Sequence, residues 1–220
     1  MNIEELIKNR HSVRRYKDIP LKESDIAKIN DYIKEINQND LSFELVTNEN
    51  IFKNLILGYG FIKNCNNYII LGGKDNELLE EKVGYFGEEL VLKLLDLGIH
   101  SCFVGGTYKK KKVKNELEDG YKNVLVLAVG YGENNGKLAK TKTFDEISIS
   151  KDVPDWYKKG IELVLFAPSA INQKKWEFEL IKPNGVKIKS FGKHFPKVDL
   201  GIAKYHFEIG AGKDNFKWIK

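Results

Sequence analysis

Cysteine is scarce in this 220-residue sequence, with Cys65 and Cys102 as the two examples. They lie far apart and show neither a CxxC pair nor Cys/His ligand spacing, which argues against a disulfide framework and a structural zinc site. We expect two buried thiols in a reducing compartment. No apolar run approaches the roughly 20 residues that span a bilayer. The acidic start at residues 1–5 lacks the layout of a secretory signal, so we expect a cytoplasmic protein without membrane contacts.

Signatures of hydrolytic, metal-assisted and nucleotide-binding chemistry are also missing. None of the scattered histidines has a carboxylate or cysteine at ligand spacing. His206 lies in an apolar segment and is predicted to be packed rather than catalytic. The chain has neither the GxGxxG order of a dinucleotide-binding turn nor the order of a P-loop. Nucleophilic or metal-assisted hydrolysis therefore has little support, and we expect no metal site.

The charge balance is mildly basic, with a net charge of +5 and a pI near 8.9. This favours an anionic ligand such as a phosphate but is too small to indicate nucleic acid. The dense basic run at residues 109–112 is predicted to be a solvated face beside a turn.

Alternating helical and extended patterns predict an α+β fold, with helices flanking a mixed or largely antiparallel sheet. Helices are predicted at residues 3–9, 24–36, 79–97, 155–166 and 198–210. Strands are predicted at residues 41–46, 68–71, 99–104, 123–129, 176–182 and 186–190. Ser24 is expected to cap its helix, and Gly98 to end the next one in a left-handed conformation. Residues 133–152 are predicted to form a surface connection.

A short internal repeat links the two ends of the chain. Residues 36–45 and 171–180 align at an offset of 135 (171 − 36) and are identical at six of ten positions. Each copy lies between a predicted helix and a predicted strand. Two turns could converge on this pattern, but duplication is favoured, with the second copy shortened between strand and helix. The later helices show a weaker match, Val83–Leu97 against Val198–Gly212.

The segment after the first helix is a candidate anion site. In an extended segment alternate residues face the same way, so Arg10, Ser12 and Arg14 should converge. Guanidinium groups bind phosphate oxygens in pairs. A solvated basic loop would show the same pattern.

A second candidate is the stretch at residues 167–173, which follows an apolar helix. Its small residues let a flat ligand approach the backbone, and Ser169, Asn172 and Gln173 offer neutral donors and acceptors. A helix end stopped by Pro168 is the structural alternative.

Two weaker candidates complete the set. Residues 97–106 end a predicted strand in two glycines, which can expose backbone N–H groups to a ligand or form a tight turn. Lys140 and Lys142 lie on one side of an extended segment and mean little alone.

Together the four segments resemble the FMN-dependent nitroreductase family. That family has an R-x-S-x-R/K segment after its first helix, a P-S-x-x-N-x-Q-like segment, a glycine pair after its central helix and a late basic pair. The resemblance covers most of the chain from residue 1 to 178. The corresponding residues here are Arg10, His11, Ser12, Arg14, Val104, Gly105, Gly106, Lys140, Lys142, Pro168, Ser169, Ala170, Asn172 and Gln173.

The resemblance implies a role for each segment. Arg10 and Arg14, with Lys140 or Lys142, would bind the FMN phosphate. The serines and Asn172 would lie nearer the ribityl chain or the ring, and backbone N–H groups near residues 104–106 would face the ring. NADH or NADPH would supply hydride for a nitroaromatic, quinone or similar small-molecule acceptor. Because the flavin would carry the chemistry, no side chain need act as nucleophile or base, and no catalytic residue is expected.

The order of the motifs departs from the family pattern. The Pro-Ser segment usually follows the arginine segment early in the chain, and the flavin lies at a dimer interface. Here the full Pro-Ser segment stands in the second copy of the repeat, which has no R-x-S-x-R of its own. The resemblance thus implies an internally duplicated pseudo-dimer, with residues 1–150 as the first half and 151–220 as a shortened second half. Such a chain would be a monomer with one flavin.

Two other functions fit the same residues. One is a non-catalytic protein that stores or senses FMN. The other is a protein-interaction module that kept the fold and lost the flavin. Flavin content, and bleaching of the flavin by NADH or NADPH, would separate the three.

Overall fold

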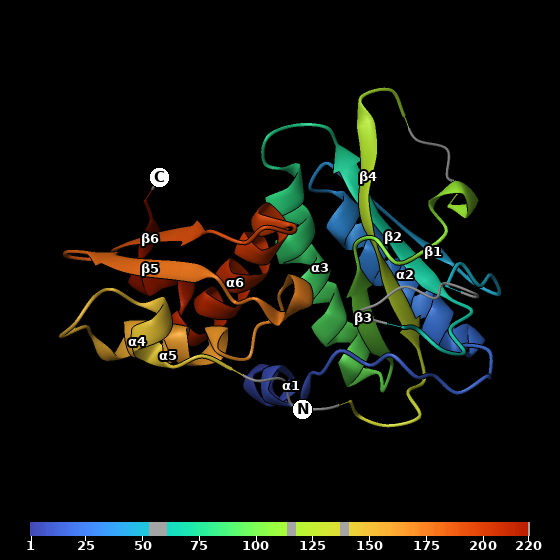
Figure 1. Ribbon diagram of the computed structural model, residues 1–220, viewed down its shortest axis with the longest axis horizontal. Coiled ribbons are helices and arrows are strands. Elements are labelled where there is room, and N and C mark those ends of the chain that lie inside the picture. The colour runs from blue at the N-terminus through green and yellow to red at the C-terminus, as the bar shows by residue number, and fades with distance from the viewer. Residues whose placement is uncertain (53–60, 114–117, 137–140, 220) are drawn as a thin grey trace.

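The computed structural model describes residues 1–52, 61–113, 118–136 and 141–219 and confirms the α+β class (Figure 1). The helices are α1 (Ile3–Asn9), α2 (Glu23–Asn37), α3 (Leu79–Asp96), α4 (Phe144–Ile147), α5 (Asp155–Val164) and α6 (Pro196–Ala211). The strands are β1 (Leu41–Val46), β2 (Tyr68–Lys74), β3 (His100–Val104), β4 (Tyr121–Gly130), β5 (Trp176–Ile181), β6 (Gly185–Ser190) and β7 (Lys217–Trp218).

The strands form two sheets rather than one. The larger sheet has the order β1-β2-β4-β3 and is antiparallel throughout. The smaller has the order β5-β6-β7, with β5 and β6 antiparallel and β7 parallel to β6.

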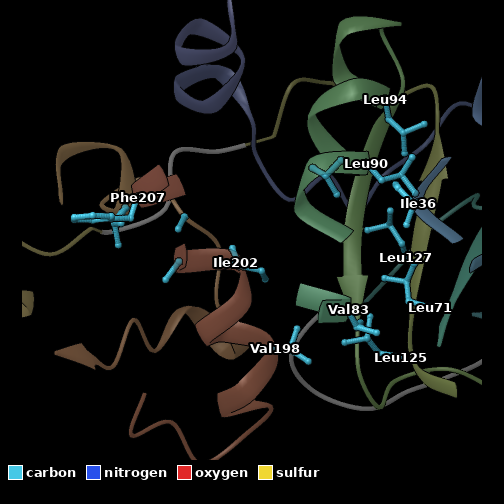
Figure 2. Packing of buried hydrophobic residues seen from close by; sticks show 14 of the residues in the cluster. Ile36, Leu71, Val83, Leu90, Leu94, Leu125, Leu127, Val198, Ile202 and Phe207 are labelled. Carbon is cyan, nitrogen blue, oxygen red and sulfur yellow. The ribbon is translucent and has the colours of Figure 1, made fainter. Parts of the chain in front are cut away.

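Helix α3 joins the two parts of the molecule, because it packs against the larger sheet on one side and against α6 on the other (Figure 1). Leu90 and Leu94 of α3 are fully buried and point toward Ile36 of α2 and Leu127 of β4 (Figure 2). On the other side Val198 and Ile202 of α6 join the same core. A single apolar cluster therefore extends from α2 to the C-terminal sheet.

Most predicted elements agree with the structure to within two residues at each end, apart from β2, which ends three residues later than predicted. The prediction that Ser24 caps its helix is wrong: α2 begins at Glu23 after Lys22, without a side-chain cap. Gly98 has φ 76° just after α3, as expected. The predicted surface connection contains α4, which is held by a capping box of Thr143 and Glu146.

Two further sequence predictions can be compared with the described residues. Cys65 and Cys102 are free and buried, as predicted. No helix in the described ranges combines the length and the apolar character needed to cross a bilayer.

A hairpin followed by a helix occurs twice, as β1-β2-α3 and as β5-β6-α6. β5 begins 135 residues after β1 (176 − 41), whereas β6 follows β2, and α6 follows α3, by 117 (185 − 68 and 196 − 79). The register repeats as well. Leu41 of β1 lies opposite Gly73 of β2. The offset of 135 relates Leu41 to Trp176, and the offset of 117 relates Gly73 to Ser190, and these two residues also lie opposite each other. The helix starts thus differ by 117, not by the 115 of the sequence alignment.

Helices α3 and α6 approach each other through glycines. A Cβ atom on Gly84 would lie 2.0 Å from the carbonyl oxygen of Val198, and one on Gly201 would lie 1.9 Å from that of Glu81. The offset of 117 relates Gly84 to Gly201 and Glu81 to Val198, so the two contacts are reciprocal. Contacts between two elements that are related by a two-fold axis are reciprocal in this way.

Gly201→Ala is expected to lower the free energy of unfolding by about 3 kcal/mol, because the added methyl group must push the α3 backbone away. Urea denaturation monitored by circular dichroism measures this. Gly106→Ala is the control, since a Cβ there meets no atom within 4 Å. Equal stability of the two variants would contradict the close helix contact.

Candidate functional site

A cavity of about 830 Å³ lies where the amino-terminal arginine segment meets the turn after α5. Its volume is within the roughly 300–1,000 Å³ of ligand and cofactor pockets. Its walls come from residues 10–15, the end of β3, the stretch 165–174 and the start of α6. Segments distant in the sequence, one near each end, therefore share a single cavity.

The arginine segment is extended and anchored on its inner side. The backbone N–H of Val13 donates to the carbonyl oxygen of Ser101 at 3.0 Å. The Tyr16 hydroxyl lies 2.7 Å from the carbonyl oxygen of Val13, and both residues are buried. Because Val13 and Tyr16 point into the core, Arg14 on the other side is exposed and lines the cavity.

Arg10 is fixed by a buried carboxylate. Its Nε lies 3.3 Å from Oε1 of Glu88, a residue of α3 with no exposed surface. His206 of α6 contacts the same oxygen through Nε2 at 2.9 Å and the carbonyl oxygen of Leu163 through Nδ1 at 3.0 Å. His206 is thus packed, as predicted, and also positions Arg10.

The Pro-Ser turn holds an unusual backbone. Ile171, Asn172 and Lys174 have φ values of 48°, 56° and 42°, a left-handed conformation that non-glycine residues rarely adopt. The hydroxyl oxygen of Ser169 accepts a hydrogen bond from the backbone N–H of Lys174 at 2.9 Å. Strain of this kind persists where surrounding contacts impose it, and it gathers at binding sites.

Asp199 of α6 supplies those contacts. Its carboxylate accepts hydrogen bonds from the backbone N–H of Ala170 at 2.8 Å and from the Gln173 amide at 2.7 Å. Burial raises the pKa of Asp199 to about 6, against the opposite effect of these two bonds. The site therefore contains a carboxyl group that titrates well above its usual range.

Gly105 and Phe195 form the wall near β3. Phe195, with φ 48°, places its ring so that a Cβ on Gly105 would lie 2.2 Å from it. A side chain at position 105 would displace the ring, which explains a glycine here.

Nine of the predicted site residues line the cavity: Arg10, His11, Ser12, Arg14, Gly105, Pro168, Ser169, Ala170 and Asn172. Four others do not. Val104 is buried in β3, Gly106 lies beyond the wall, Lys142 pairs with Glu146 at 2.9 Å, and Gln173 binds Asp199. Lys140 lies outside the described residues.

The lining residues that were not predicted include Arg15, Phe103, Thr141, Lys174, Phe195 and Asp199. Lys174 directly follows the Pro-Ser segment and could have been noticed there. The sequence around Asp199 and Phe195 does not indicate a site, because these residues reach the cavity only when α6 packs against the Pro-Ser turn.

The sequence matches a known protein family over almost its whole length. A family model described as "Putative TM nitroreductase" matches residues 2–211. No curated protein matches the sequence significantly.

Several solved structures share the fold. A "putative nitroreductase" from Thermotoga maritima MSB8 has 21% identity and a TM-score of 0.69, covering 97% of this chain and 85% of its own. A nitroreductase family protein from Streptococcus pneumoniae TIGR4 has 21% identity and a TM-score of 0.55, covering 68% of this chain and all of its own. A "putative NADH oxidase" from Clostridium acetobutylicum has 23% identity and a TM-score of 0.51, covering 66% and 99%.

The pKa of Asp199 leads to a stability prediction. The pKa of Asp199 in the folded protein exceeds that in an unfolded chain, so the folded protein binds this proton more tightly. Proton binding by Asp199 therefore stabilises the folded state fully below about pH 4, and this contribution is lost as the pH rises through 6. The loss is about 3 kcal/mol for a shift of about two units. Asp199→Asn should remove this part of the pH dependence in urea titrations between pH 4 and 7. The exposed Asp214→Asn is the control, and parallel curves for Asp199→Asn and the wild type would contradict the prediction.

Proposed function

Because this chain belongs to the nitroreductase family, we propose that it is an FMN-dependent oxidoreductase. It takes hydride from NADH or NADPH and reduces a nitroaromatic, quinone or similar acceptor. The observation that carries the proposal is the shared cavity. It has a volume of about 830 Å³, and both the arginine segment and the Pro-Ser turn line it. A cavity filled by packed side chains would have argued against it.

The residues present suit FMN in charge and in shape. Arg10, Ser12 and Arg14 offer guanidinium and hydroxyl donors to a phosphate. Opposite them, the small residues of the Pro-Ser turn and Gly105 leave backbone at the cavity surface, where a flat ring can approach. A bound flavin would supply the redox chemistry.

The chain's own residues would bind and orient the cofactor rather than act as nucleophile or base. Glu88 and His206 hold Arg10 in place before any ligand arrives, and Asp199 holds the Pro-Ser turn. Backbone N–H groups at the Gly105 wall would stabilise negative charge on the reduced ring. A site held in this way loses little free energy to reorganisation on binding.

We further propose that the chain is an internally duplicated pseudo-dimer with one flavin. Equal hairpin registers and the reciprocal glycine contacts of α3 and α6 support a duplication. Only the first copy has the R-x-S-x-R segment, and only the second has the Pro-Ser turn. Residues 1–150 and 151–220 would then complete one site between them in a monomer.

Arg14→Ala is expected to weaken FMN binding by roughly 10- to 150-fold, the value of one charged hydrogen bond at about 1.5–3 kcal/mol. Arg14 is preferred to Arg10 because its removal leaves no buried carboxylate behind. Fluorescence titration of the apoprotein measures the affinity, with the exposed Lys8→Ala as a control of equal charge change. Unchanged affinity in Arg14→Ala would count against the phosphate assignment.

Purified protein should contain one FMN per chain in a particle of monomer size, and NADH or NADPH should bleach it under anaerobic conditions. Absorbance and light scattering give the first result, and stopped-flow spectra the second. A flavin that neither nucleotide reduces would favour a storage or sensing protein. Protein that stays colourless with added FMN would overturn the proposal, and two flavins per chain would contradict the single site.

A further inference from the structure

Lys174 is a buried cation at the wall of the cavity. Only 5% of its surface is exposed, although lysine is almost never buried unless it is paired. Its left-handed backbone and the bond from its N–H to Ser169 turn the side chain inward. The neighbouring Lys175 is exposed.

The partners of the Lys174 ammonium group are neutral. Its Nζ donates a short hydrogen bond to the carbonyl oxygen of Leu165 and lies 3.4 Å from Oγ1 of Thr141. Within the described ranges, none of the ion pairs includes Lys174. Of the buried carboxylates, Glu88 contacts Arg10 and His206 through Oε1, and Asp199 binds the Pro-Ser turn.

The surroundings make this charge unfavourable in the free protein. Burial and the nearby Arg10 guanidinium lower the pKa of Lys174 to about 8. A buried charge without an oppositely charged partner is unfavourable. A dianion in the cavity would offset both effects, because it would attract Lys174 and Arg10 together.

The neighbours of Lys174 indicate which part of a ligand it meets. An ammonium group has three donors, and two face Leu165 and Thr141. Thr141 stands between the two lysines of the predicted phosphate-binding segment, and Arg10 belongs to the other such segment. The anionic end of a ligand is therefore the part closest to Lys174.

We propose that Lys174 is a phosphate ligand of this cavity and, with Arg10, selects FMN over flavins without a phosphate. This inference rests on the proposed flavin function. It replaces Lys142, whose ammonium group pairs with Glu146, by a lysine that the sequence patterns did not single out.

A structural role is the competing explanation. A cation beside the carbonyl groups at the C-terminal end of α5 stabilises the helix whatever the cavity binds. Loss of such a role would weaken the binding of every flavin equally, whereas loss of a phosphate ligand would weaken FMN alone.

The test compares FMN with riboflavin in fluorescence titrations of wild-type apoprotein, Lys174→Gln and Lys175→Gln. Glutamine keeps a donor for Leu165 but removes the charge. We expect FMN affinity of Lys174→Gln to fall roughly 10- to 150-fold, with riboflavin affinity nearly unchanged. Lys175→Gln should match the wild type for both.

The possible outcomes separate the two proposals. An equal loss for both flavins, or no loss for FMN, would overturn the role of Lys174 and leave the flavin function standing. Wild-type protein that binds neither flavin would overturn both.

A second measurement needs no variant, should Lys174→Gln fail to fold. At pH 8 about half of the free protein has an uncharged Lys174, so FMN binding should take up about half a proton, and riboflavin none. Calorimetry in buffers of different ionisation enthalpy gives this number. Of the neighbouring groups, neither Asp199, with its pKa of about 6, nor His11, with its lowered pKa, titrates there. Equal uptake for FMN and riboflavin would overturn the proposal.

Discussion

The close approach of α3 and α6 is the contact on which the rest of the structure depends. Gly84 and Gly201 leave no side chain between the helices at these two points, so a carbonyl group of each helix lies close to the backbone of the other helix. That approach brings Glu88 of α3 to His206 of α6, and through Glu88 it holds Arg10. It also brings the start of α6 to the turn after α5. Both walls of the cavity are therefore attached to one pair of helices.

The cavity is surrounded by ionisable groups that burial makes costly. Glu88 has no exposed surface, and burial raises the pKa of Asp199. Lys174 is a buried cation without an anionic partner among the described residues. Replacing buried charged groups by well-packed apolar residues is often neutral or stabilising in proteins. Polar groups retained at such a cost are typical of a site whose geometry must be fixed before its ligand binds. An anionic ligand would use the excess positive charge that Arg10 and Lys174 create.

The fold was largely predictable because it follows from local pattern. Apolar residues at helical spacing placed α3, and a continuous apolar run placed β4. The arginine and Pro-Ser segments were predictable as well, because each carries its chemistry in adjacent residues. The supporting residues were not. Asp199 acts across 29 residues and Glu88 across 78 (199 − 170 and 88 − 10), and each looks like an ordinary helix residue until the helices pack. The ion pair of Lys142 with Glu146 was not foreseen, because a basic pair does not reveal that an acidic residue four positions away will contact it.

The two copies of the repeat have different surroundings, which bears on the proposed single site. In the first copy the Asn37 amide accepts from the N–H of Phe43 and donates to its carbonyl oxygen, so the turn closes on its own strand. In the second copy the carboxylate of Asp199 accepts from the backbone N–H of Ala170 and holds the turn against the cavity. If the halves arose by duplication, the turn that Asp199 holds is the one that became part of the site. A second site related by the repeat would need a Pro-Ser pair in the first copy and an R-x-S-x-R segment in the second, and the sequence has neither.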